Sequence, residues 1–147
     1  MRQFGKRIVV FLLAFCLTLG VGSVTAGATV SRSSEFFTGY SANVTGKSGG
    51  KICVTVSVKA RSEMDVLGVN SVTIYESKDN SSFYPVATYR AADYPEMLGS
   101  GVLFSKTVVT YSGTVGYYYQ AKVAVYAEND TGCESRGIMT SAKRAFQ

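Results

Sequence analysis

The amino-acid sequence predicts an all-β protein: a single antiparallel β-sandwich of about seven strands that follows a removable N-terminal segment. Three observations lead to this prediction. The chain is rich in Val, Ser, Thr, Tyr and Gly beyond its first 28 residues, with two prolines and no tryptophan. Short runs of alternating apolar and polar residues recur between turn-like segments. No stretch has the apolar period of an amphipathic helix, so strands are favoured throughout.

Residues 1–28 have the composition of a secretory signal peptide. A positive start is followed by an almost uninterrupted apolar run over residues 8–21, and the basic residues of that start are Arg2, Lys6 and Arg7. The run is shorter than the ~20 residues that cross a bilayer comfortably, and small residues follow it instead of a basic stop. A retained membrane anchor is the alternative interpretation, which these two features disfavour.

The predicted cleavage site follows Ala28, at the end of Ala26-Gly27-Ala28, and cleavage after Ala26 is the second choice. Residues 29–35 are polar and predict a flexible leader, so the sandwich domain is expected over residues 36–147. About 119 residues then remain, which is enough for one domain with one core.

Removing residues 1–28 also removes three of the basic residues. The remaining 12 lysines and arginines stand against 10 acidic residues, so the formal net charge falls from +5 to +2. The one adjacent basic pair that remains, Lys143-Arg144, is interpreted as a solvated chain end. Nucleic acid is therefore not an expected partner, and contact with the membrane is expected only during export.

The first half of the domain contains the clearest strand. A first strand is predicted over residues 36–45, with a turn at 47–50, and the second strand covers residues 51–60. Apolar and polar residues alternate strictly along this second strand, which is typical of a sheet with one wet face. Its predicted core face consists of Ile52, Val54, Val56 and Val58.

A hairpin is predicted after a connection over residues 61–69. Its arms cover residues 70–78 and 83–91, and the polar residues 79–82 form the turn between them. Pro85 cannot donate a hydrogen bond to a neighbouring strand, so the second arm is expected at a sheet edge or with a bulge.

The second half begins with a long loop over residues 92–101. A strand over 102–111, a turn over 112–116, a strand over 117–129 and a last strand over 137–145 complete the prediction.

The strand over residues 117–129 carries four tyrosines and divides into two faces. The predicted core face consists of Tyr117, Tyr119, Ala121, Val123, Val125 and Ala127. The other face is mixed, and it presents Tyr118 and Tyr126 on either side of Lys122. Exposed tyrosines are enriched at protein interfaces and pack on sugars, so Tyr118, Lys122 and Tyr126 are the predicted contact surface. Cross-strand pairing that merely stabilises the outer face is the alternative.

Two of these segments resemble a known family. "SVTIYESKDNSSFYPVATYRA" resembles the C–C′ hairpin of fibronectin type III-like domains, and "SGTVGYYYQAKVAVYAENDTGCES" resembles their E–F turn and F strand. The resemblance covers roughly residues 50–140 and implies a fibronectin type III-like or immunoglobulin-like sandwich. "MDVLGVNSVTI" also resembles small secreted proteins of Gram-positive bacteria that carry a domain of unknown function. That likeness implies a secreted single domain and brings no activity or functional residues.

The chain contains no histidine, which excludes Ser-His-Asp catalysis, Cys-His catalysis and histidine-ligated zinc. Its carboxylates fall in predicted loops without catalytic or calcium-binding spacing. We therefore expect no enzyme, metal or cofactor, but a secreted binding or cell-surface interaction module for an unknown protein or a cell-wall glycan. A carboxylate-dependent hydrolase and a secreted toxin or antimicrobial factor are the alternatives.

Cys53 and Cys133 are the two cysteines beyond residue 28. In a secreted chain the usual expectation is a disulfide. If the strands alternate in direction, however, the two cysteines fall at opposite ends of the sandwich, well beyond the reach of a bridge. The prediction therefore leans against an intramolecular bond.

Overall fold

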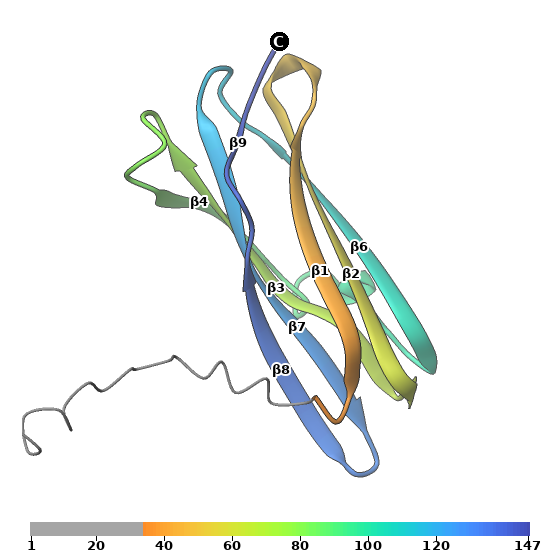
Figure 1. The fold of residues 1–147 in the computed structure, drawn as a ribbon. Helices are drawn as coiled ribbons and strands as arrows, with labels where there is room; N and C mark the ends of the chain where they lie inside the picture. Colours follow the sequence, from red (N-terminus) through yellow and green to blue (C-terminus); the bar gives the residue numbers. More distant parts are fainter. Residues whose placement is uncertain (1–33) are drawn as a thin grey trace, which may run out of the picture. The chain divides into compact units, whose positions relative to one another are not determined.

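Two antiparallel sheets face each other in the computed structural model, which describes residues 34–147 (Figure 1). The smaller sheet has the order β1-β2-β6, from β1 (Phe37–Gly46), β2 (Lys51–Met64) and β6 (Val102–Ser112). The larger sheet has the order β4-β3-β7-β8, from β4 (Tyr84–Arg90), β3 (Val66–Ser77), β7 (Tyr118–Asn129) and β8 (Gly132–Met139). The predicted all-β sandwich is confirmed.

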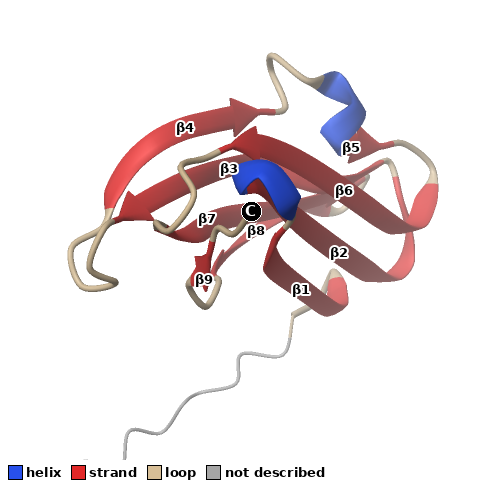
Figure 2. Cartoon of the chain, turned by 90° about the horizontal axis from the view of Figure 1, so that it is seen from above, coloured by secondary structure: helices blue, strands red, loops and turns tan. Residues whose placement is uncertain are grey.

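Four shorter elements complete the chain. Strand β5 (Leu98–Gly99) pairs with β3, and β9 (Lys143–Arg144) pairs with β7. The 3-10 turns are η1 (Ser48–Gly50) and η2 (Pro95–Met97). Viewed along the strands, β4 and β6 lie at one margin of the sandwich and β1 with β9 at the other (Figure 2). The predicted signal peptide, with its cleavage site at Ala28 or Ala26, lies outside the described residues.

The core forms where the alternation predicts it. The side chains of Ile52, Val54, Val56 and Val58 are all at most 1% exposed, which confirms the predicted inner face of β2. Burying a valine in this way stabilises a fold by about 1.5–3 kcal/mol. The alternate residues of β7 are also fully buried, namely Tyr119, Ala121, Val123, Val125 and Ala127. Tyr117, just before β7, is half-buried against this core.

The predicted connection over residues 61–69 is wrong, because nearly all of it is strand. Strand β2 continues to Met64 and β3 begins at Val66, so Asp65 alone lies between them. Charged residues and a glycine make this stretch resemble a loop, but residues 66–69 pair with β7, and Met64 pairs with Val102 of β6. Gly68 is required here, because a Cβ on it would lie 2.2 Å from the carbonyl oxygen of Met97.

The predicted last strand, residues 137–145, is also wrong in its bounds. Strand β8 begins at Gly132, because the β7–β8 turn is short: the Asn129 side chain accepts hydrogen bonds from the backbone N–H and the hydroxyl of Thr131. The chain then leaves the sheet after Met139 and returns as β9. The predicted loop over residues 92–101 contains η2 and β5.

The prediction for Pro85 is confirmed. Strand β4 lies at the edge of the larger sheet, and its pairing with β3 steps from Ala87 directly to Pro85, which leaves Val86 as a bulge. The turn before β4 is closed by the Asp79 carboxylate, which accepts hydrogen bonds from the backbone N–H groups of Ser81 and Ser82.

Cys53 and Cys133 are free thiols in different sheets, the first buried and the second exposed. Cys53 pairs with Thr45 near the end of β1, whereas Glu134, next to Cys133, bonds the N–H of Phe36 just before β1 begins. The two cysteines are thus separated by almost the whole of β1, about 26 Å at 3.3 Å per residue. A disulfide requires Cα atoms less than about 7 Å apart.

Candidate functional site

The predicted contact surface lies on the outer face of β7, in the interior of the larger sheet. Tyr118, Lys122 and Tyr126 are four residues apart, so neighbours in this series lie about 13 Å from each other. Lys122 is exposed and both tyrosines are half-buried. The three side chains therefore follow one strand as a strip and do not surround a common pocket.

The two ends of this strip have opposite electrostatic surroundings. The guanidinium of Arg144 lies 5.9 Å from the ring centre of Tyr118. At the other end the Tyr126 hydroxyl donates to the carboxylate of Glu128, and this hydrogen bond raises the pKa of Tyr126 well above its usual range. Tyr118 therefore belongs to a cationic region and Tyr126 to an acidic one.

Five exposed cationic side chains gather at the end of the sandwich where Tyr118 lies. They come from three segments: the β1–β2 turn with the first residue of β2, the residue after β3, and β9. We call this group the cationic end; its members are Lys47, Lys51, Lys78, Lys143 and Arg144. Because the three segments are far apart in the sequence, the fold alone brings them together.

The C-terminal segment is held at the cationic end by main-chain hydrogen bonds. The N–H of Ala145 donates to the carbonyl oxygen of Tyr117 at 2.8 Å, and the N–H of Gly50 donates to that of Phe146 at 2.9 Å. Ala145 is 1% exposed and belongs to the core. Gly50 has a φ of +75°, and a Cβ on it would lie 2.7 Å from the carbonyl oxygen of Gly113, so glycine is required where these segments meet.

Two of the cations lie over tyrosine rings. The Lys78 ammonium is 5.6 Å from the ring centre of Tyr117, and Arg144 covers Tyr118 in the same way. Such contacts contribute about 0.5–1 kcal/mol at exposed sites. A shallow cleft of about 320 Å³ lies beside them, lined by Val115, Gly116, Arg144, Ala145, Phe146 and Gln147. The cationic end thus combines positive charge with aromatic and apolar surface.

The two carboxylates near the cationic end already have intramolecular donors. Glu76 accepts the hydroxyl of Tyr119, whose burial and whose bond to Glu76 raise the pKa of Tyr119 to about 12. Hydrogen bonds from Ser81 and its neighbours hold the pKa of Asp79 below its usual range. Within residues 34–147 the one ion pair joins Arg136 to Glu134, so no cation of the cationic end has an acidic partner.

The opposite end of the sandwich is acidic. The pairing of Val66 with Glu128 brings the β2–β3 corner next to the β7–β8 turn. Acidic side chains from both places lie there, namely Glu63, Asp65, Glu128, Asp130 and Glu134. Over the part of the chain that the structure describes, no three Asp, Glu or Cys side chains are arranged to hold a metal ion. The sandwich is therefore electrically polarised along its strands.

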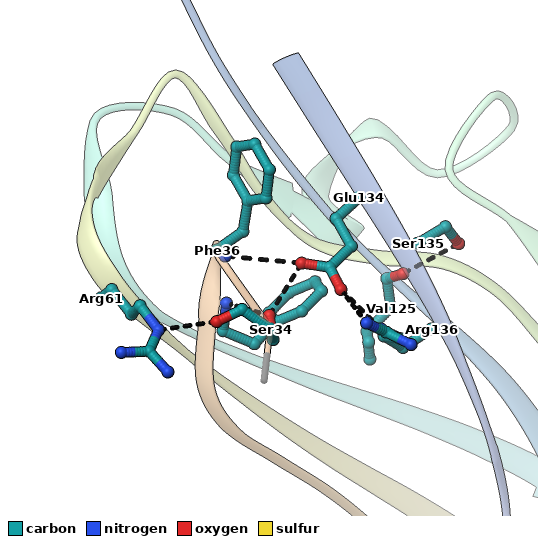
Figure 3. A network of polar contacts seen from close by, with 8 residues as sticks. Ser34, Phe36, Arg61, Val125, Glu134, Ser135 and Arg136 are labelled. Carbon is teal, nitrogen blue, oxygen red and sulfur yellow. Dashed lines mark hydrogen bonds and ion pairs between the residues drawn. The ribbon is translucent and has the colours of Figure 1, made fainter. Parts of the chain in front are cut away.

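Glu134 fixes the start of the described chain at this acidic end (Figure 3). Its carboxylate accepts the Ser34 hydroxyl at 2.7 Å and forms the ion pair with Arg136. Arg61 donates to the carbonyl oxygen of Ser34 at 2.7 Å. Partial burial raises the pKa of Glu134, but the bonds from Ser34 and Arg136 outweigh burial and hold the pKa below its usual range. Ser34, expected in the flexible leader, is thus tied to the sandwich.

No protein-family model matches the chain, and no curated protein matches its sequence. Among residues 34–147, no helix is both long enough and apolar enough to cross a membrane.

Sequence reasoning missed most of the cationic end. Lys143-Arg144 stands out in the sequence as a pair, but its composition alone predicts a solvated chain end. Lys47, Lys51 and Lys78 carry no local signal, because each lies beside polar turn residues, where lysine is common. Only the register of the strands shows that these turns meet.

Proposed function

We propose that the protein is exported and acts without catalysis as a binding module, whose cationic end holds an anionic cell-wall glycan. One observation carries the proposal: five exposed cations from three segments lie together without acidic partners, two of them over tyrosine rings. Cationic groups attract phosphate or carboxylate groups, and tyrosine rings offer apolar faces to sugars. Lys, Arg and Tyr side chains in this arrangement support recognition of a polyanion.

Export rests on residues 1–28. Sequencing the N-terminus of the protein recovered from the culture medium or cell wall tests it. Cleavage after Ala28 gives a chain that begins at Thr29, and cleavage after Ala26 gives one that begins at Gly27. An uncut chain in the membrane fraction would instead support the retained anchor.

The sandwich is further proposed to be fibronectin type III-like. The resemblance assigns β3 and β4 to strands C and C′, and β6 and β7 to strands E and F. Two features support this assignment: β4 pairs with β3 in the sheet that contains β7, and β6 pairs with β2 in the other sheet. In the immunoglobulin constant-type arrangement, the strand after C joins the sheet of strand E instead.

Binding is tested with insoluble cell walls of a Gram-positive bacterium, before and after hydrofluoric acid has removed their phosphodiester-linked polymers. Residues 29–147 are used, because residues 34–147 form a compact unit with its own core. We expect sedimentation of the protein with untreated walls, weaker binding at higher salt, and little binding to treated walls. Surface charge interactions weaken with salt because the Debye length shrinks from ~10 Å at 0.1 M to ~3 Å at 1 M.

The double variant Lys47→Ser/Lys143→Ser removes two exposed lysines of the cationic end. Each contributes about 0.5–1 kcal/mol near an anionic surface, so affinity should fall roughly tenfold. The control Lys59→Ser/Arg90→Ser removes the same charge elsewhere and should bind as the wild type does. Equal loss in both doubles would show a net-charge effect and would contradict a localised site.

The variant Lys122→Ser distinguishes binding at the cationic end from binding at the strip of Tyr118, Lys122 and Tyr126 on β7. If the strip carries binding, this single change weakens it more than the Lys47→Ser/Lys143→Ser double does. If the cationic end carries binding, Lys122→Ser has little effect, because Lys122 lies about 13 Å along the strand from Tyr118.

A further inference from the structure

A cleft of about 270 Å³ lies at the margin of the sandwich where β4 and β6 run, and the turn η2 lies at the same margin (Figure 2). Strand β6 contributes residues 107–110 to its lining, and the other lining residues are Tyr89, Tyr94, Glu96 and Met97. None of the five residues of the cationic end lines it. Pockets for drug-sized ligands have volumes of about 300–1,000 Å³, so this cleft suits a small chemical group.

The inner part of the cleft is shielded from water. Met97 is 3% exposed, and Thr107 and Val109 are each 7% exposed. The Thr107 hydroxyl donates to the carbonyl oxygen of Met97, and the Tyr89 hydroxyl donates to that of Thr110, both at 3.4 Å. Both hydroxyl protons are therefore used within the chain. A sugar, which would need to accept hydrogen bonds from such hydroxyls, is disfavoured as the ligand.

Two tyrosine rings form a corner of the cleft. The ring centres of Tyr89 and Tyr94 are 5.6 Å apart, and their planes are inclined by 52°. Burial, and then the neighbouring Tyr94 and Tyr111, raise the pKa of Tyr89, so this side chain keeps its hydroxyl proton and stays uncharged. The faces of aromatic rings attract cations, and the attraction grows where water is excluded.

The one formal charge in the lining is negative and belongs to Glu96. Within residues 34–147 the single ion pair joins Arg136 to Glu134, so Glu96 has no cationic partner there. No lysine or arginine of the described chain lines the cleft. A carboxylate beside two tyrosine rings attracts a cation, repels an anion and adds nothing to the binding of a neutral group.

We propose that this cleft binds the alkylated ammonium group of a small organic cation. Such a group carries a positive charge, and its methyl groups pack against rings and apolar side chains such as those of Met97 and Val109. A primary ammonium has three N–H donors to satisfy, whereas the carbonyl oxygens of Met97 and Thr110 already accept hydroxyl groups. Aromatic cages that recognise quaternary ammonium ligands use the same chemistry.

The test is an NMR titration of ¹⁵N-labelled residues 29–147 with choline chloride, at an ionic strength held constant with sodium chloride. We expect saturable shifts at the amides of Tyr94, Met97 and Val109, with a dissociation constant in the millimolar range, because each contact is weak at a partly exposed site.

Two matched probes separate the parts of this chemistry. Ethanolamine keeps the charge of choline but lacks its methyl groups. The uncharged alcohol in which carbon replaces the nitrogen of choline keeps the shape but lacks the charge. Both should bind at least about fivefold more weakly than choline.

The variants Glu96→Gln and Tyr94→Leu should each weaken choline binding about two- to fivefold, and the double variant about tenfold. The controls Glu63→Gln and Tyr84→Leu make the same changes outside the cleft and should bind choline as the wild type does; Tyr84 is 68% exposed.

An unchanged choline affinity in the Glu96→Gln/Tyr94→Leu chain overturns the proposal. So does equal affinity for choline and either of the matched probes, and so does the absence of saturable shifts at the cleft. This proposal does not rest on glycan binding at the cationic end, which the cell-wall sedimentation measures separately, so either proposal can fail alone.

Discussion

Replacing Gly113 by alanine tests how tightly Tyr119 is held in the core. A Cβ at this position would lie 2.7 Å from the Cζ atom of Tyr119 and 3.0 Å from its Cε2 atom, where ordinary contacts begin near 3.4 Å. The ring cannot move aside, because it is fully buried and its hydroxyl bonds both Glu76 and the N–H of Thr114. Crowding of this kind costs about 1–3 kcal/mol.

The loss of glycine flexibility in the unfolded chain offsets about 0.4–1 kcal/mol of that cost. We therefore expect Gly113→Ala to lower the free energy of unfolding by about 1–2 kcal/mol, and the melting temperature by about 4–8 °C for a domain of this size. Urea and thermal unfolding followed by tyrosine fluorescence and circular dichroism measure both quantities.

The matched control is Gly137→Ala, because a Cβ at Gly137 meets nothing within 4 Å. This variant should be as stable as the wild type or slightly more stable. If Gly113→Ala proves as stable as Gly137→Ala, Tyr119 is not packed as described.

Three further predictions concern single groups. Glu134→Gln should lower the free energy of unfolding, measured with urea at pH 7, by about 1–2 kcal/mol, because charge-assisted hydrogen bonds are lost. Equal free energies of unfolding for the two proteins at pH 7 would contradict this. The wild type should lose more stability than this variant as the pH falls below about 4.5, because the lowered pKa of Glu134 stabilises the fold only while the carboxylate is charged. The raised pKa of Tyr119 predicts the opposite pH dependence. Its contribution to the free energy of unfolding is fully present below pH 10 and is lost as the pH rises toward 12, and Tyr119→Phe should flatten that part of the stability–pH curve. A thiol reagent should modify Cys133 at once and Cys53 only after unfolding, and an intact mass two hydrogens short would instead reveal a disulfide.

The strands that could be predicted from the sequence are those with one face in water. Val54 and Val56 alternate with polar residues, so β2 was readable, and the same holds for β7 around Val123. The segment over residues 61–69 lacks this alternation, and its charges and glycine resemble a loop. Its extended form depends on pairing with distant strands, β7 for residues 66–69 and β6 for Met64, which no local pattern contains.

The cationic end could not be predicted for a related reason. Tyr118 was singled out for its alternation, but its surroundings depend on Arg144, which is 26 positions away in the sequence and lies over its ring. Lys47 and Lys78 enter the same region from two other turns. Electrostatic sites assembled from separate turns become visible only when the strand order is known.

The most direct test of the binding proposal is an NMR titration of ¹⁵N-labelled residues 29–147 with a soluble anionic polymer released from Gram-positive cell walls. The largest amide shifts should cluster at Lys47, Gly116 and Lys143, and should fade as salt is added. Shifts centred on Lys122 and Tyr126, or no saturable shifts, would show that the cationic end is not where this protein holds its partner.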